Sequence, residues 1–175
     1  MQTRIDLTNP KWANWLTGFI DGEGCFSVSF TKRAKLTFGV QVRPSFSVAQ
    51  SNKRVPIQKR KQVLETIKQY FGCGEIRVDR ATGMAIYESR NLTDIATKIL
   101  PHFDKYPLLT VKNEDFESLK KITVLMRANQ HLNKLGLEKI IFIAFKMNPS
   151  GKRKNTKQAL LEFLEYKAKS TSPNL

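Results

Sequence analysis

Residues Leu16 to Gly24 read Leu-Thr-Gly-Phe-Ile-Asp-Gly-Glu-Gly, and this stretch decides the fold. Two glycines inside a helix each cost about 1 kcal/mol relative to alanine, so Gly18 and Gly22 need a structural reason. They are four residues apart and share one helix face, where a second helix can approach almost backbone to backbone. The sequence therefore predicts a helix over residues 10–23 that forms a dimer interface through Gly18, Gly22 and Asn14.

Two acidic residues, Asp21 and Glu23, fall where this helix ends. If the helix pairs with a copy of itself, two-fold symmetry brings together carboxylates from both chains. Divalent metal offsets their repulsion, and magnesium prefers one or two carboxylates together with phosphate oxygens. Paired metals over a phosphodiester can generate a nucleophilic water and stabilise the leaving oxygen. The alternative is an ordinary helix end with solvated acids.

The flanking sequence predicts alternating helices and hairpins. Apolar and polar residues alternate over residues 26–31 and 38–48, which predicts one long hairpin, and residues 75–79 and 85–90 predict a second. Helices are expected from Pro56 to Gly72, and over residues 91–103, 112–129, 137–147 and 156–169. The order αββαββα predicts an α+β fold, with an antiparallel curved sheet, helices on one face and further C-terminal helices over about residues 112–169. A length of 175 residues fits a single domain over residues 1–175.

Composition points to a polyanionic partner. Lys and Arg number 30 against 15 Asp and Glu, giving a formal charge of +15. No apolar run reaches the roughly 18 residues of a membrane span, and no secretory signal opens the chain, so no membrane partner is expected and the protein should be intracellular. Two cysteines, Cys25 and Cys73, and two histidines make no zinc-finger pattern, so any catalytic metal should have oxygen ligands. Both cysteines are expected to be reduced core residues.

The expected sheet, over about residues 25–90, should bind DNA through its polar face. A two-stranded ribbon fits the major groove, where Arg, Gln, Ser and Thr can pair with base edges. Between Cys25 and Leu64 there is no acid, and the basic residues are Lys32, Arg33, Lys35, Arg43, Lys53, Arg54, Lys59, Arg60 and Lys61. The predicted DNA contacts are Ser27, Ser29, Thr31, Arg33, Gln41, Arg43, Ser45 and Ser47, with Arg77 and Tyr87 from the second hairpin and Lys152 and Arg153 from a basic run.

The nine residues from Leu16 to Gly24 resemble the motif of the LAGLIDADG homing endonucleases, with substitutions of similar size or charge. Later landmarks look like those of the same family, namely the basic hairpin, residues 46–50, residues 70–74 and residues 99–108. The resemblance covers roughly residues 12–148.

This resemblance implies roles for individual residues. Glu23, with the carbonyl of Gly22, matches the acid that binds the catalytic ions, while Asp21 matches a structural position. Gln50 matches a residue that orders catalytic water, and Arg54 a basic residue beside it. Lys112 matches a lysine near the scissile phosphate, with Lys105 as its rival. The implied cofactor is Mg²⁺, with Mn²⁺ substituting and Ca²⁺ binding without supporting cleavage.

A single copy of the motif is present, and family members of that type are homodimers with nearly palindromic targets. The favoured interpretation is an intron-encoded homing endonuclease that cuts double-stranded DNA. Two alternatives share the scaffold: a maturase that binds intron RNA, and a catalytically inactive DNA-binding regulator. Neither needs Glu23, whose presence favours the nuclease. The sequence leaves open whether the compartment is an organelle or a prokaryotic cytoplasm.

Overall fold

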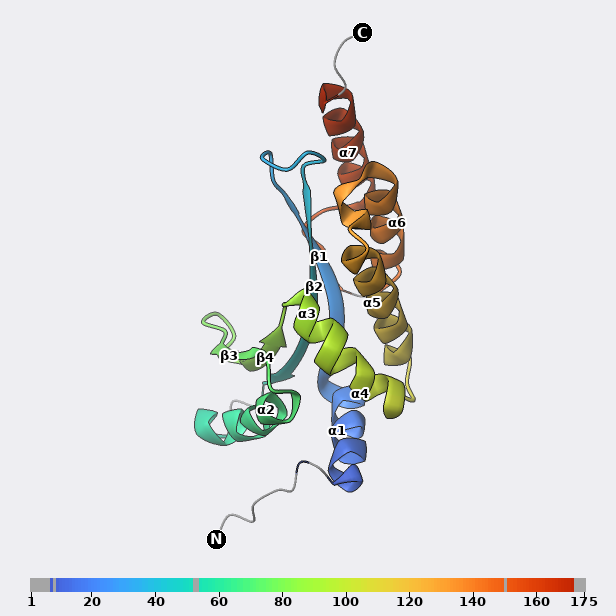
Figure 1. Ribbon diagram of the computed structural model, residues 1–175. Coiled ribbons are helices and arrows are strands. Elements are labelled where there is room, and N and C mark those ends of the chain that lie inside the picture. Colours follow the sequence, from blue (N-terminus) through green and yellow to red (C-terminus); the bar gives the residue numbers. More distant parts are fainter. Residues whose placement is uncertain (1–6, 8, 52–53, 150, 172–175) are drawn as a thin grey trace. The chain divides into compact units, whose positions relative to one another are not determined.

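The computed structural model describes residues 7, 9–51, 54–149 and 151–171 (Figure 1). Four strands form one antiparallel sheet in the order β1-β2-β4-β3, so the predicted α+β fold is confirmed. The elements are α1 (Pro10–Glu23), β1 (Gly24–Lys32), β2 (Val40–Gln50), α2 (Ile57–Phe71), β3 (Glu75–Val78), β4 (Ala85–Ser89), α3 (Leu92–Asp94), η1 (Ile95–Ile99), α4 (Leu100–Lys105), α5 (Lys112–Arg127), η2 (Gln130–Leu132), α6 (Lys134–Ala144) and α7 (Lys157–Thr171). Within the described ranges, no helix combines the length and hydropathy of a membrane span.

The first helix begins and ends where the sequence predicts. The Asn9 side chain accepts a hydrogen bond from the Lys11 amide at 2.9 Å, and Pro10 occupies the first helical position, where a missing amide hydrogen costs nothing. Thr8, which precedes this cap, lies outside the described residues, as does Lys53 of the basic stretch. The inner face of α1 buries Ala13, Leu16, Thr17 and Ile20.

Two local departures from the sequence prediction have physical causes. The helix expected over residues 91–103 contains a π turn, η1, in which the Leu100 amide bonds to the Ile95 carbonyl, directly before Pro101. Proline has no amide hydrogen to continue the α-helical ladder. Phe38 was expected in the strand that follows the first turn, but Phe38 and Gly39 belong to the turn itself, and Gly39 takes a positive φ of +69°.

Contacts group the chain into two compact units, 1–25 with 45–113, and 26–44 with 114–175. The first unit has an aromatic core, in which Phe46 meets Phe71, Tyr87 and Phe103 with ring centroids 5.7–6.1 Å apart. Edge-to-face contacts of this kind add to the energy gained by burying the rings. In the second unit Phe26 packs on Phe116 and Phe30 on Phe145, while α6 and α7 pack together.

Side chains from the loop after α6 cap the outer edge of β1. Asn148 donates to the Phe26 carbonyl at 2.8 Å, Arg153 to Val28 at 3.0 Å and Asn155 to Phe30 at 3.2 Å. Alternate carbonyls of an edge strand point outward and would otherwise be free to pair with another chain. The side-chain donors satisfy these carbonyls without adding a strand.

A buried hydrogen-bonded relay fixes α1 against α2 and α4. The Thr17 hydroxyl donates to the Ala13 carbonyl at 3.1 Å, so its oxygen accepts from His102 Nε2 at 3.0 Å. His102 Nδ1 then accepts from the Tyr70 hydroxyl at 2.9 Å. His102 is only 5% exposed, and burial lowers its pKa to about 4. The relay therefore requires a neutral imidazole.

This relay predicts a pH-dependent stability. Between its ordinary pKa of 6.5 and the folded value of about 4, His102 takes up a proton in the unfolded state before the folded state does. Falling pH over this window should remove stability on the order of 3 kcal/mol. His102→Gln, which keeps hydrogen-bonding groups, should show a smaller loss. Urea unfolding at pH 7 and pH 5 measures both proteins, and equal losses would contradict the assignment.

Candidate functional site

The end of α1 is tied to the segment that leads into α5. Asp21 accepts hydrogen bonds from the Leu109 amide at 2.9 Å, the Thr110 amide at 3.2 Å and the Thr110 hydroxyl at 2.6 Å. Hydrogen bonds to an ionised carboxylate are stronger than neutral ones. With its lone pairs used in this way, Asp21 is engaged in holding the backbone of residues 109–110.

Lys112, the first residue of α5, lies against the exit of α1. Its Nζ donates to the carbonyls of Ile20 at 3.2 Å and Gly22 at 3.1 Å. A cation suits this position because the last carbonyls of a helix carry partial negative charge. The rival Lys105 instead places its Nζ 5.3 Å from the ring centroid of Tyr106. The structure thus brings Lys112 to the motif.

Glu23, the last residue of α1, is exposed, and the neighbouring Gly22 carbonyl contacts Lys112. These oxygens are the donor type that magnesium prefers. In the described part of one chain, however, no three His, Cys, Asp or Glu side chains gather as metal ligands. The described part of one copy offers one such carboxylate at this position, which is part of the ligand set that a magnesium site needs.

Gln50 and Arg54 lie at and beyond the end of β2. The Gln50 amide donates to the Ala49 carbonyl at 3.1 Å, and residue 50 pairs with Ala85 in the sheet. Nearby Arg60 donates to the carbonyls of Val55 at 3.0 Å and Gly83 at 2.8 Å. Arg60 was expected only as part of a basic surface, but it joins the turn before α2 to the β3–β4 turn.

The outer face of α1 is open. A Cβ added at Gly18 or Gly22 would meet nothing within 4 Å, and Asn14 is exposed one turn earlier. Beside them Trp15 is 47% exposed, and it stacks on Phe19 with the ring centroids 5.2 Å apart. Within the described residues, the two glycines therefore accommodate no other part of their own chain.

In the second unit the polar side chains alternate with buried ones, as the sequence predicts. Phe26, Val28, Phe30, Val40 and Val42 are buried. The intervening side chains are half-buried or exposed, and they are Ser27, Ser29, Thr31, Gln41 and Arg43, with exposed Arg33 just beyond β1. Arg33 Nε donates to Gln41 Oε1 at 3.4 Å across the hairpin.

Two residues predicted for the polar face in the first unit need correction. Tyr87 is fully buried among core aromatics and donates to the Cys73 carbonyl at 3.2 Å, so it cannot reach DNA. It pairs with Val48 in the sheet and shares its core-facing side. Ser45 has the expected parity but is only 7% exposed, and its hydroxyl donates to Glu88 at 3.0 Å. Ser47 and Arg77 remain accessible.

The prediction that Arg153 contacts DNA also needs correction. Its guanidinium donates to the carbonyls of Val28, Ala144 and Met147 and lies 4.7 Å from the Phe145 ring centroid. Burial lowers its pKa, although the guanidinium remains charged at neutral pH. These contacts give Arg153 a structural role in place of the predicted DNA contact. Its neighbour Lys152 is exposed, as expected.

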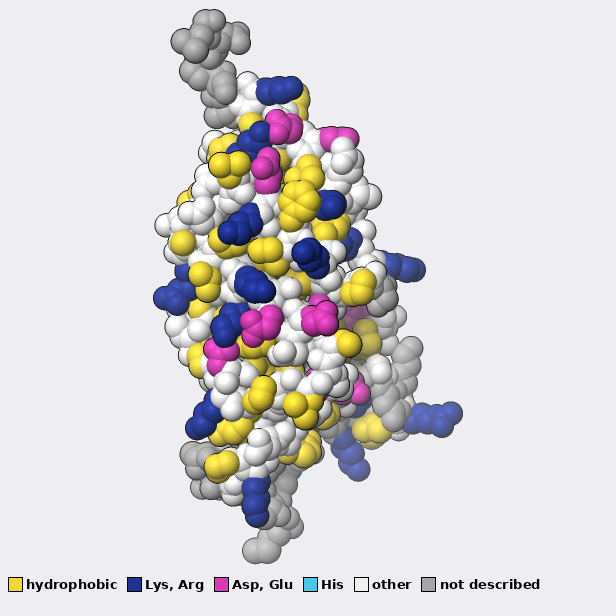
Figure 2. Space-filling view, turned by 90° about the vertical axis from the view of Figure 1, so that its right-hand side faces the viewer, with side chains coloured by type: hydrophobic (Ala, Val, Ile, Leu, Met, Phe, Trp, Pro, Cys, Tyr) yellow, Lys and Arg dark blue, Asp and Glu magenta, His cyan; other side chains and the backbone are white. Residues whose placement is uncertain are grey.

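Basic residues on the helices of the second unit are mixed with acids. Lys134 forms ion pairs with Glu138 and Glu165, and Lys157 lies 4.8 Å from the Phe142 ring centroid. Figure 2 shows basic, acidic and hydrophobic side chains interspersed on one face of the molecule. The helices thus contrast with the acid-free stretch from Cys25 to Leu64.

Three polar residues with clear structural or surface roles were missed by sequence reasoning. Asn148 and Asn155 cap carbonyls more than a hundred residues away, at separations of 122 and 125, so no local signal could reveal them. Glu88 could have been identified from the alternation of side chains along β4. It follows the buried Tyr87 directly, so it points to the opposite, open face of the sheet.

Comparison with known proteins shows which family the chain resembles. The family model described as "LAGLIDADG endonuclease" matches residues 16–123. Among solved structures, the homing endonuclease I-TnaI is 33% identical, with a TM-score of 0.73 over 89% of this chain and 97% of that one. The archaeal intron-encoded homing endonuclease I-Vdi141I, solved with DNA, is 25% identical, with a TM-score of 0.78 over 91% of this chain and 98% of that one.

Curated proteins of similar sequence indicate the same family. The homing endonuclease I-ApeII of Aeropyrum pernix is 26% identical over 86% of this chain and 87% of its own length. A protein in ND4 intron 1 of Podospora anserina is 36% identical over 69% of this chain, which spans 25% of that relative's length. Three further intron-encoded relatives are matched over 28%, 22% and 55% of their lengths. The model match and the motif at the end of α1 show that the chain belongs to the LAGLIDADG endonuclease family.

Proposed function

We propose that the chain is a subunit of a site-specific homing endonuclease that hydrolyses double-stranded DNA with divalent metal. The observation that carries this proposal is the grouping at the end of α1. There the Lys112 ammonium donates to the Gly22 carbonyl, the residue after Gly22 is the exposed Glu23, and Asp21 holds the segment that leads to Lys112. The names of relatives that are endonucleases, several of them encoded in introns, support it.

Glu23 and the Gly22 carbonyl would hold the metal, with Mg²⁺ as the proposed ion. When bound, divalent metal polarises the phosphate and activates water for attack. Lys112 supplies a fixed positive charge beside these ligands, where it can stabilise the charge that develops on the phosphate. Gln50 and Arg54 are proposed to order water and contact phosphate near the site.

A second copy would complete this metal site. Among the residues that the structure describes, none packs on Gly18 or Gly22, and the same face of α1 carries the half-exposed Trp15. Leu109 and Val111, on either side of Thr110, are 90% and 82% exposed. Covering apolar side chains of this size is a driving force for association. Helix pairing through α1 would bring two Glu23 carboxylates together across the symmetry axis.

DNA would bind the open polar sheet surfaces. In the second unit these carry Ser29, Thr31, Arg33, Gln41 and Arg43, and in the first unit Ser47 and Arg77. Their hydrogen-bonding groups suit base edges in the major groove, and the excess of positive charge suits the phosphates. Ser27 and Lys152 are proposed as further contacts.

Replacing Glu23 by glutamine tests the metal role. Glu23→Gln keeps the size but removes the charge, so cleavage with magnesium should fall at least about a hundredfold while DNA binding in calcium is retained. A randomised duplex library, assayed for cutting and for binding, measures both quantities. If Glu23→Gln cuts as well as wild type, the proposed metal site is wrong. Binding by wild type without cutting would indicate a DNA-binding regulator.

Replacing Gly18 by leucine tests the interface. Gly18→Leu should leave the monomer folded, because a Cβ at this position meets none of the described atoms within 4 Å, but it should block close helix pairing. Analytical ultracentrifugation should show a dimer for wild type and a monomer for this variant. Lys121→Leu, on the exposed surface of α5, adds the same side chain elsewhere and should remain dimeric. A dimeric Gly18→Leu protein would remove α1 from the interface.

A further inference from the structure

We propose that Glu88 determines part of the DNA specificity by orienting two arginines, Arg77 and Arg90, to read guanine. This inference rests on the proposed DNA-binding function and adds two residues, Glu88 and Arg90, to it. Its basis is a single carboxylate, on the open face of the sheet, that holds two half-exposed guanidinium groups.

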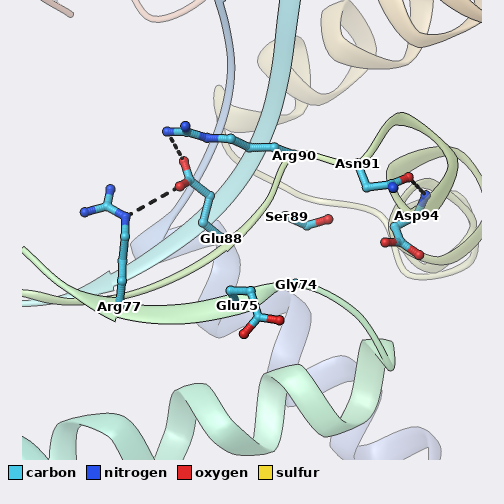
Figure 3. A pocket seen from close by; sticks show the side chains of 8 residues that line it. All are labelled: Gly74, Glu75, Arg77, Glu88, Ser89, Arg90, Asn91 and Asp94. Atoms are coloured by element: carbon cyan, nitrogen blue, oxygen red, sulfur yellow. Dashed lines mark hydrogen bonds and ion pairs between the residues drawn. The ribbon is translucent and has the colours of Figure 1, made fainter.

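The three side chains converge in the first unit (Figure 3). Arg90 Nη2 lies 2.9 Å from Glu88 Oε1, and Arg77 Nε lies 3.6 Å from Glu88 Oε2. The Glu88 side chain is 15% exposed, whereas those of Arg77 and Arg90 are 47% and 56% exposed. The carboxylate is therefore largely covered, while both guanidinium groups remain available to a ligand.

Strand register places Glu88 and Arg77 on the open face. Glu88 pairs with Ser47 in β2 and with Glu75 in β3, and Arg77 pairs with Ile86. The neighbouring position in β4 is the buried Tyr87, which marks the opposite, core-facing side. Because side chains alternate between the two faces of a sheet, Glu88 and Arg77 share the side away from the core.

Further contacts restrict how these groups move. Ser45 donates to Glu88 Oε1 at 3.0 Å, so the carboxylate is held from β2 as well. Arg77 Nη1 lies 3.7 Å from Asp79, whose carboxylate accepts hydrogen bonds from Thr82 that lower its pKa. Arg77 is thus bracketed by two carboxylates, and Arg90 is anchored by one.

This restriction suits base reading better than phosphate binding. A guanidinium has five donors in a planar fork, so an arginine that contacts a carboxylate with one edge can present another edge. That edge matches the O6 and N7 acceptors of guanine in the major groove. An arginine held in place loses less conformational entropy on binding. Phosphate contacts, which position a protein without reading sequence, do not need such restraint.

Two charge-matched variants test the proposal. Glu88→Gln keeps the size of the side chain but weakens its hold on both arginines. Glu75→Gln is the control, because Glu75 lies directly opposite Glu88 in the register, is 86% exposed and is paired with Lys68. Both variants change the net charge equally. Base preference is measured by selecting a randomised duplex library in calcium, and thermal unfolding checks that each variant is folded.

Wild type and Glu75→Gln should share a guanine preference that Glu88→Gln weakens about tenfold at one or two positions of each half-site, with other positions unchanged. Arg77→Lys and Arg90→Lys, both at half-exposed positions, should weaken the preference for guanine at the same positions of the half-site. Identical profiles for Glu88→Gln and Glu75→Gln, or a uniform loss at every position, would overturn the role of Glu88 alone. A wild-type protein that binds no duplex would overturn the proposed function as well.

Discussion

The hydrogen bonds of Asp21 are the constraint on which the proposed site depends. They join the last turn of α1 to Leu109 and Thr110, 88 and 89 residues further along the chain. Thr110 in turn accepts from the Lys112 amide at 3.2 Å, so the lysine begins α5 beside the Gly22 carbonyl. One acid of the motif thus organises the backbone, while the other, Glu23, is exposed.

The inner and outer faces of α1 differ in what they contact. On the inner face Thr17, His102 and Tyr70 form a buried relay, and such satisfied polar networks favour one arrangement over others. On the outer face glycines leave the backbone open. A helix held firmly on one side can offer the other to a second copy without rearrangement, which lowers the entropic cost of association. In the second unit the capped edge of β1 closes another route to self-association.

Much of this could be predicted from local sequence. Alternation located the strands, and the spacing of Gly18 and Gly22 located the open face of α1. Tyr87 was predicted to contact DNA together with Arg77, but it alternates with Glu88 along β4 and therefore faces the core, whereas Glu88 and Arg77 lie on the open side of the hairpin. Arg153 could not have been assigned, since it bonds to Val28, 125 residues earlier, and only the folded chain brings them together.

The central claim is that two copies pair through α1 and so bring their Glu23 carboxylates together. Spin labels at Lys11→Cys, in the exposed first turn of α1, with Cys25 and Cys73 replaced by serine, would report the distance between copies near the proposed interface. Paired helices lie with their axes about 8–10 Å apart, so pulsed electron resonance should give an inter-label distance below about 25 Å. An absence of dipolar coupling between copies, in a sample that sediments as a dimer, would contradict the account.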